Sequence, residues 1–222
     1  MNTELFKKET SKKIGLFFSQ FKLLKYKKHD IFLRPEDIPS GVFYLKRGCV
    51  KLYSISKDGE ELTLILFQPQ NIFPLMWAIN NKQISYYLEA MTLVELYKSP
   101  RGKFIEFIKA NPDVLYELLK RNLARFGGLL ERMEYLVFGN AYAKIASIIL
   151  ILADHFGKEK NNEITIQIPL THKDISALVG ITRETVSLEL GKIEKKKIIS
   201  FKGRKLVIKN PKELKKESLL SI

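Results

Sequence analysis

The sequence contains a single cysteine, Cys49, among its 222 residues. One cysteine cannot form an internal disulfide, a cysteine-rich zinc site or a cysteine-ligated iron–sulfur cluster, so we expect Cys49 to be a small buried hydrophobic side chain. No apolar run approaches the ~18 residues that a membrane-spanning helix needs. Residues 1–21 contain several charged side chains and lack the long apolar core of a signal peptide. These absences predict a cytoplasmic protein with no membrane partner.

Sequence motifs of catalysis and metal binding are also missing. We find no Gly-rich phosphate loop, paired carboxylates, metal-ligand spacing or Ser–His or Cys–His combination that stands out. The candidate haem ligands are His29, His155, His172, Met76 and Cys49. We expect His29 and His155 at the surface or in turns, while His172 lies in a predicted helix-turn-helix. The sequence therefore predicts no enzymatic activity, no metal and no cofactor.

Acidic residues are few relative to basic ones, with 24 Asp and Glu against 38 Lys and Arg and a formal net charge of +14. Such an excess favours a polyanionic partner, either nucleic acid or an anionic membrane surface. A Lys-rich surface can also serve solubility alone, so charge does not decide the function.

The first half of the chain is rich in short apolar runs separated by turn residues. This pattern is typical of an antiparallel barrel or jelly roll, with Asp58-Gly59 as a positive-φ hairpin turn. The predicted strands are His29–Leu33, Val42–Lys46, Val50–Ser56, Leu62–Phe67, Tyr86–Met91 and Val94–Lys98.

After Pro100 the apolar period becomes helical, first over Arg101–Ala110 and then over a long helix, Pro112–Val137. The long helix carries apolar residues at alternating intervals of four and three, which favours helix–helix dimerisation; burial in the core of a monomer is the alternative. Gly127-Gly128 interrupts the predicted helix, and either a close helix approach or a bend would explain the pair. The predicted dimer interface consists of Leu115, Leu119, Asn122, Phe126, Leu129, Met133 and Leu136.

A boundary at Phe138–Asn140 precedes a helix over Ala141–Phe156, a polar loop and a strand over Ile164–Ile168. Thr171 can cap the next helix, with Asp174 completing a capping box, and Gly180 ends it. Thr182 caps a second helix whose inner face is Val186, Leu190 and Ile193. Two short helices joined by a tight glycine turn form a helix-turn-helix, although an ordinary helical hairpin has the same spacing.

Two β-like runs, Ile198–Phe201 and Lys205–Lys209, follow the second helix around Lys202-Gly203-Arg204. They predict a hairpin wing with basic residues at its tip, suited to contacting phosphates. In a helix-turn-helix the start of the second helix enters the major groove, where Arg can bind guanine and Glu can accept from cytosine. The predicted base-reading residues are Arg183, Glu184, Ser187 and Leu188.

These motifs together resemble the Crp/Fnr family of transcription regulators, most specifically through Asp174–Gly180, Thr182–Ser187 and Ile198-Ile199. The resemblance implies an α+β fold with a cyclic-nucleotide-binding-like β jelly-roll sensor over residues 1–111. It further implies a dimerisation helix over residues 112–138 and a winged helix-turn-helix DNA-binding domain over residues 139–222. RNA polymerase would be a further partner.

The resemblance also implies roles for single residues. Arg183 and Glu184 would contact bases, and Leu188 stands where the family often has a second Arg, so only apolar contact, for example with a thymine methyl, is available there. The residues implied to contact phosphates are Thr171, Lys173, Thr182, Thr185, Lys202 and Arg204.

The sensor region departs from the family pattern. Members that bind cyclic AMP carry a Gly-Glu and an Arg-Ser pair, and residues 71–91 contain neither; Leu129 and Leu130 replace two polar residues that contact adenine. We therefore expect no tight cyclic-AMP binding, because the cyclic phosphate would lose water without gaining a charge partner. The candidate effector pocket, which could equally be ordinary core, is lined by Phe73, Leu75, Met76, Trp77, Tyr86 and Tyr87.

The sequence thus predicts a homodimeric, sequence-specific transcription regulator that binds a pseudo-palindromic site in double-stranded DNA, with an unknown effector. One alternative is an architectural protein that binds nucleic acid without sequence preference. Another is a sensor that acts through a protein partner and retains a vestigial DNA-binding module.

Overall fold

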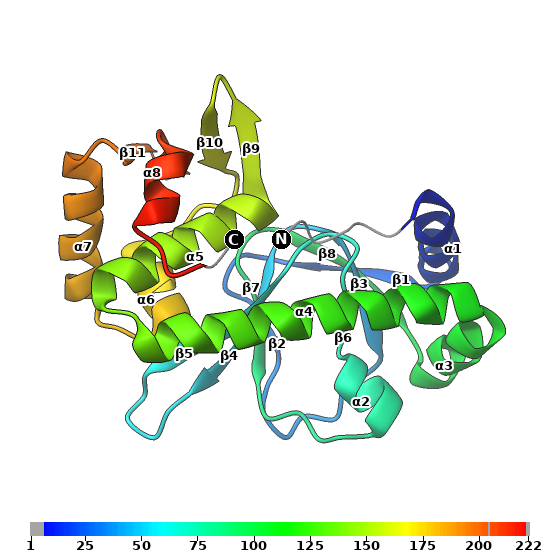
Figure 1. The fold of residues 1–222 in the computed structure, drawn as a ribbon. Helices are drawn as coiled ribbons and strands as arrows, with labels where there is room; N and C mark the ends of the chain where they lie inside the picture. Colours follow the sequence, from blue (N-terminus) through cyan, green and yellow to red (C-terminus); the bar gives the residue numbers. More distant parts are fainter. Residues whose placement is uncertain (1–6, 204, 221–222) are drawn as a thin grey trace. The chain divides into compact units, whose positions relative to one another are not determined.

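The computed structural model describes residues 7–203 and 205–220 (Figure 1). The described residues form two compact units, one of residues 7–59 and 63–123 and the other of residues 60–62 and 124–220. No helix within these residues is both long and apolar enough to cross a membrane.

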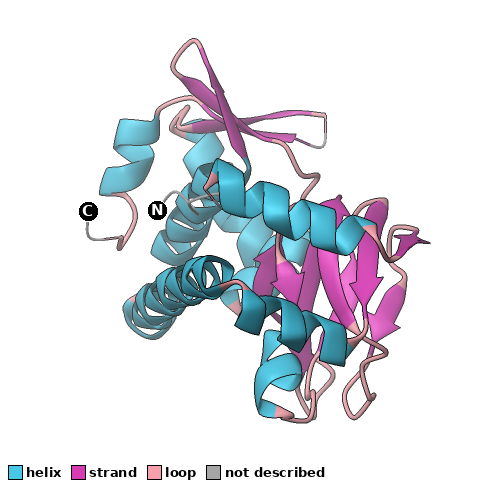
Figure 2. Ribbon diagram, turned by 90° about the vertical axis from the view of Figure 1, so that its right-hand side faces the viewer, coloured by secondary structure: helices cyan, strands magenta, loops and turns pink. Residues whose placement is uncertain are grey.

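The first unit is built on two four-stranded sheets with the orders β1-β8-β3-β6 and β2-β7-β4-β5 (Figure 2). The pairings β1–β8, β3–β8, β3–β6, β2–β7 and β4–β7 are antiparallel, as the predicted jelly roll requires. The strands are β1 (Lys22–Tyr26), β2 (Ile31–Leu33), β3 (Val42–Arg47), β4 (Val50–Ile55), β5 (Glu61–Phe67), β6 (Ile72–Phe73), β7 (Tyr87–Ala90) and β8 (Val94–Ser99).

One core of this unit is formed by side chains from both sheets, including Phe43 and Leu96 from one and Val50 and Leu88 from the other. Alternate residues of each strand point inward, so this face of each sheet is removed from water. Cys49 is buried, as expected from its apolar character.

A second core covers the outer side of β3 with helices. It contains Phe18 of α1 (Lys8–Ser19), Tyr44 of β3 and Phe104 of α3 (Arg101–Ala110). The rings of Phe18 and Tyr44 stack with centroids 5.1 Å apart. A short helix, α2 (Leu75–Asn80), follows β6. Elements α1, β1, β6 and α2 were not predicted from the sequence.

Helix α4 (Pro112–Phe138) is continuous and runs from the first unit into the second. Val114 and Leu118 on one face belong to the second core. The predicted interruption at Gly127-Gly128 is wrong, because both residues are helical. A Cβ atom added at either glycine would meet no described atom within 4 Å. Packing within the chain therefore does not require a glycine at either position.

The second unit is a helical core with a four-stranded sheet of order β11-β12-β10-β9. Residues 158–160 were expected in a polar loop, and that expectation is wrong. They belong to β9, and Asn161 and Asn162 close the β9–β10 hairpin with positive φ angles of 54° and 61°. The elements are α5 (Ala141–Phe156), β9 (Gly157–Lys160), β10 (Glu163–Ile166), α6 (His172–Val179), α7 (Arg183–Lys195), β11 (Ile199–Lys202), β12 (Lys205–Ile208) and α8 (Pro211–Lys216).

The hairpin turns of the first unit supply a test of this fold. Gly48 has φ of +97°, and a Cβ atom there would collide with the carbonyl oxygen of Leu93; Gly59 has φ of +81° with nothing within 4 Å of an added Cβ. We expect Gly59→Ala to cost about 1–2 kcal/mol through backbone strain alone. Gly48→Ala should cost roughly 1–3 kcal/mol more, because the backbone must also move. Urea denaturation of both variants measures the difference, and equal free energies of unfolding would contradict the described approach of Gly48 to Leu93.

Candidate nucleic-acid interface

Helix α6 begins with the predicted capping box. The Thr171 hydroxyl accepts a hydrogen bond from the Asp174 backbone N–H at 3.1 Å, and the Thr171 N–H donates to the Asp174 carboxylate at 2.7 Å. The helix ends at Gly180, whose φ of +64° is left-handed and whose N–H donates to the Ser176 carbonyl at 2.8 Å. Local sequence therefore fixes both ends of α6.

Helix α7 has one buried and one exposed face. Val186, Leu190 and Ile193 are buried, and Thr182 caps the helix by accepting from the Thr185 N–H at 3.2 Å. Helices α5, α6 and α7 contact one another in pairs, so the buried face of α7 rests on a packed platform. The exposed residues of its first two turns include the predicted base-reading residues Arg183, Glu184, Ser187 and Leu188.

Leu188 is the unusual member of this set, because 68% of its surface is exposed. An apolar side chain in the middle of a polar helix face gains nothing from packing within the described chain. Its position one turn after Glu184 is suited to apolar contact with a partner.

The residues expected to contact phosphates lie at the starts of α6 and α7. Thr171 and Lys173 are exposed on the first turn of α6, and Thr182 is exposed before α7. Thr185 is half-buried, and its hydroxyl oxygen is 2.9 Å from that of Thr182. Both helix starts present backbone N–H groups, which attract anions.

The wing is the hairpin of β11 and β12, in which Lys202 pairs with Lys205 and Gly203 has φ of +61°. Lys202 Nζ lies 3.7 Å from a carboxylate oxygen of Glu163. The hydrogen bond from Lys209, and then the charges of Lys209 and Lys202, hold the pKa of Glu163 below its ordinary value. Arg204, the other predicted wing contact, lies outside the described residues.

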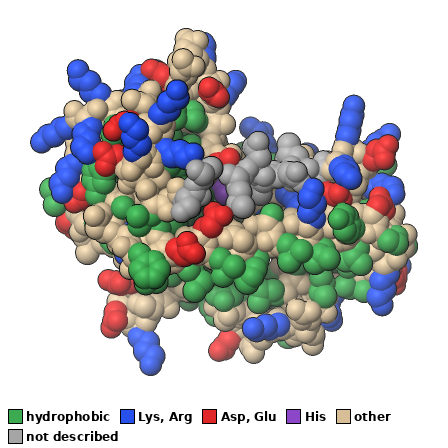
Figure 3. Space-filling view, viewed as in Figure 1, with side chains coloured by type: hydrophobic (Ala, Val, Ile, Leu, Met, Phe, Trp, Pro, Cys, Tyr) green, Lys and Arg blue, Asp and Glu red, His purple; other side chains and the backbone are tan. Residues whose placement is uncertain are grey.

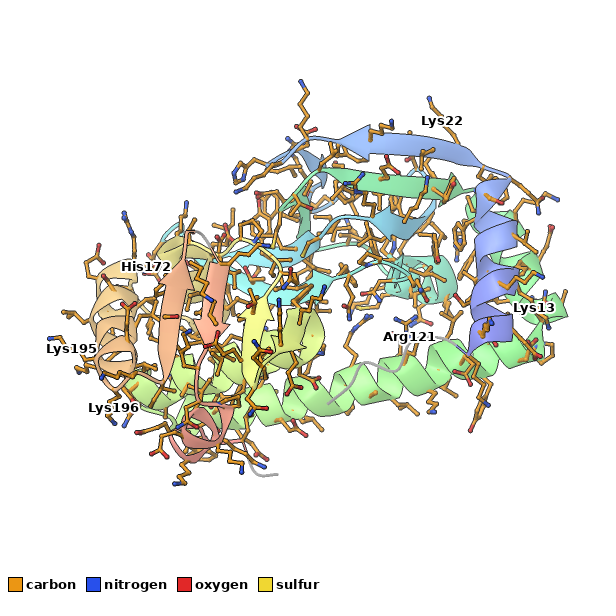
Figure 4. The ribbon with its side chains drawn as sticks, turned by 90° about the horizontal axis from the view of Figure 1, so that it is seen from above. Lys13, Lys22, Arg121, His172, Lys195 and Lys196 are labelled. Atoms are coloured by element: carbon orange, nitrogen blue, oxygen red, sulfur yellow. The ribbon has the colours of Figure 1, made fainter. Side chains whose placement is uncertain are left out.

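The wing also contacts the start of α6 through a pair of rings. This contact was not predicted from the sequence. His172 is the first residue of α6, and its ring centroid is 6.3 Å from that of Phe201 in β11 (Figure 4). The wing strand thus lies beside the start of α6. No local pattern signals such a contact, since the residues are far apart in the sequence.

The predicted dimer residues form an apolar stripe on α4 (Figure 3). Leu115, Leu119, Phe126 and Met133 are exposed, as is Asn122, whose amide donates to the Leu118 carbonyl at 2.8 Å. Leu129 and Leu136 are half-buried. The stripe is wider than the predicted seam, because further apolar residues are exposed beside it: Tyr116, Leu123, Leu130, Val137 and Phe138.

The six candidate effector residues lie in different parts of the first unit. Phe73 lies in the core between the sheets, whereas Leu75 and Trp77 pack against the second core. Met76 is exposed. The Tyr87 ring stacks on Tyr53 with centroids 5.0 Å apart, and Tyr86 is half-buried. The structure does not gather the six side chains into one cluster.

Two family models match the chain. Residues 23–111 match a cyclic nucleotide-binding domain, and residues 143–217 match a Crp-like helix-turn-helix domain. The chain is 30% identical over 185 residues to the global nitrogen regulator of Nostoc sp., covering 82% of this chain and 83% of that protein. It is 25% identical to the cAMP-activated global transcriptional regulator CRP of Pasteurella multocida, covering 86% and 92%.

Solved structures share the fold. FixK2 from Bradyrhizobium japonicum superposes with a TM-score of 0.79 at 20% identity, covering 91% of this chain and 99% of that one. A transcriptional regulator of the CRP/FNR family from Thermus thermophilus gives 0.72 at 24% identity, covering 88% and 97%.

Removing the capping box of α6 should measurably lower the stability of the protein. Thr171→Ala should lower the free energy of unfolding by about 1 kcal/mol, because the first turn of α6 loses its acceptor. Ser176→Ala is the matched control, because Ser176 lies inside α6 and alanine is the better helix former. Urea denaturation without DNA compares the two, and a Thr171→Ala protein as stable as the control would contradict the capping geometry.

Proposed function

The chain belongs to the Crp/Fnr family of DNA-binding transcription regulators, and we propose that it reads a pseudo-palindromic site in double-stranded DNA as a homodimer. In this proposal residues 1–111 are the sensor, residues 112–138 pair the two chains and residues 139–222 bind DNA. Its partners are DNA, a second copy of the chain and RNA polymerase, and it has no catalytic role.

The observation that carries the proposal is the exposure of the first turns of α7 over a buried inner face. A helix presented in this way can enter the major groove with its N-terminal residues toward the base edges. Arg183 then donates to guanine and Glu184 accepts from the amino group of cytosine. The threonines at the helix starts, Lys173 and the wing lysine contact the phosphates on either side.

Leu188 affects which base is preferred at one position of the half-site. A leucine cannot donate or accept a hydrogen bond, so the base next to it is read by shape and by apolar contact. A thymine, whose methyl group projects into the major groove, is the base best suited to this contact. We therefore propose a half-site that differs from that of relatives with a second arginine on the reading helix.

The exposed apolar stripe of α4 supports pairing of two chains. Apolar side chains recurring along one helix face are removed from water when a second helix packs against them. The empty space around Gly127 and Gly128 leaves room for a close approach of the two helices.

Independence from cyclic AMP is part of the proposal. Leu129 and Leu130 offer no hydrogen bond to an adenine ring, and residues 71–91 hold no arginine for a cyclic phosphate. Burying that phosphate without a charge partner would be unfavourable.

Base reading by Arg183 is tested by selecting binding sites from random duplexes with the Arg183→Ala variant. The variant should lose about 1–3 kcal/mol of binding free energy and relax its preference at one base position in each half-site. Lys195→Ala is the control, because it removes the same charge from the far end of α7 (Figure 4). Lys195→Ala should keep the sequence preference, and an unchanged preference in Arg183→Ala would refute base reading by this residue.

Dimerisation through α4 is tested by placing a charge in the apolar stripe. Phe126→Glu should convert the dimer to a monomer in light scattering, because pairing would bury two carboxylates without partners. Ile38→Glu makes the same change at a residue that is 87% exposed on a loop. It should leave the mass unchanged. A Phe126→Glu protein that stays dimeric while folded would exclude this face as the interface.

A further inference from the structure

Arg132, near the end of α4, contacts the helix-turn-helix through its side chain. The Arg132 guanidinium donates from Nη2 to the backbone carbonyl of Leu178, near the end of α6. Residues 132 and 178 are 46 positions apart in the sequence, so this bond joins two elements that the chain connects only through α5, β9 and β10. Both residues belong to the second unit.

The carbonyl that Arg132 meets is one that the helix itself leaves unpaired. Helix α6 ends at Val179, and the N–H groups of Gly180 and Ile181 both turn back to the Ser176 carbonyl. The Leu178 carbonyl therefore has no donor four residues ahead within α6. A guanidinium supplies that donor and also places a positive charge at the negative end of the helix dipole.

The surroundings of Arg132 show that this side chain is held in place. Arg132 is half-buried beside Tyr135, which is 1% exposed. Burial is the main cause that lowers the pKa of Arg132, with the neighbouring Tyr135 acting in the opposite direction. Burial likewise raises the pKa of Tyr135 to about 12, so Tyr135 stays neutral at ordinary pH.

The bond acts close to the reading helix. Only Val179 to Thr182 separate Leu178 from the first residue of α7, and α6 and α7 pack against each other. An attachment at the end of α6 therefore constrains the direction of α7 as well. Helix α4 is the same helix whose exposed stripe pairs the two chains under the proposed function.

We propose that Arg132 is a positioning residue that fixes the direction of α7 against the end of α4, and thereby sets the spacing of the two half-sites that the dimer accepts. The inference rests on the proposed dimeric reading of DNA. Arg132 itself touches no base. Its loss should leave each reading helix competent and make the distance between the two less strictly defined.

The test compares binding to duplexes that carry the selected half-sites at the preferred spacing, or one base pair closer or farther apart, and to a duplex with a single half-site. Arg132→Met keeps an unbranched apolar stem and removes the donor. For this variant, the ratio of its affinity at the native spacing to its affinity at the shifted spacings should fall about fivefold or more, which is the low end of the range for coupled binding sites. Its affinity for the single half-site should stay near that of wild type. Lys212→Met, an exposed charge removed from α8 in the same unit, should keep the wild-type preference.

Arg132→Lys retains the charge and a donor without the planar fork, so its spacing preference should lie between those of wild type and Arg132→Met. This variant carries the test if Arg132→Met does not fold. A wild-type spacing preference in the folded Arg132 variants would refute the positioning role, as would a loss of single half-site binding as large as the loss at the native spacing. A wild-type protein with no spacing preference would instead contradict the dimeric reading itself.

Discussion

Burial of Val186, Leu190 and Ile193 is the constraint on which the proposed DNA-reading surface depends. These residues recur at helical spacing, so burying them against the platform of α5 and α6 turns the opposite face of α7 outward. The caps at Thr171 and Thr182 and the left-handed Gly180 then decide where each helix begins and how sharply the chain turns between them. The polar chemistry of Arg183 and Glu184 becomes available for recognition because apolar packing has already fixed the helix beneath it.

In the first unit, helix α4 buries the polar Glu117 and Arg121 beside the apolar Val114 and Leu118, and it exposes an apolar stripe on its other side. The buried Arg121 donates to the Gln70 carbonyl at 3.2 Å, close to the ring of Tyr44 and the carboxylate of Glu117 (Figure 4). Burial lowers the pKa of Arg121, and the neighbouring Tyr44 and Glu117 oppose that effect. The polar interior contact ties α4 to the turn before β6, while the apolar exterior supplies the surface that we assign to pairing.

The helix-turn-helix was predictable because its signals are local. Capping residues, the glycine at Gly180 and the apolar period all lie within 26 residues of one another. The same is true of α4, whose period continues through Gly127 and Gly128. Strand β9 was missed because Lys158, Glu159 and Lys160 are all exposed and show no apolar alternation. Helix α1, whose buried residues are Thr10, Ile14 and Phe18, was missed as well.

In the candidate site, too, features with local sequence signals could be predicted and features that depend on long-range packing could not. Arg183 and Leu188 could be proposed as base-reading residues from their spacing along one helix, whereas the contact of Arg132 with Leu178 depends on how distant elements pack. The aromatic and apolar residues near Trp77 illustrate the opposite difficulty. Their types suit a ligand pocket and a core equally well, and only the fold shows that Phe73 and Trp77 lie in different clusters.

The central claim, that this protein reads a specific sequence through two related α7 helices, is tested most directly by selection from random duplex DNA. The experiment uses the full-length wild-type chain, without added ligand and at fixed physiological salt. The account predicts enrichment of a two-fold symmetric site whose half-sites lie about one helical turn apart. Strongly salt-dependent binding with no enriched sequence, even after addition of cell extract, would contradict it and indicate a protein that recognises only the DNA backbone.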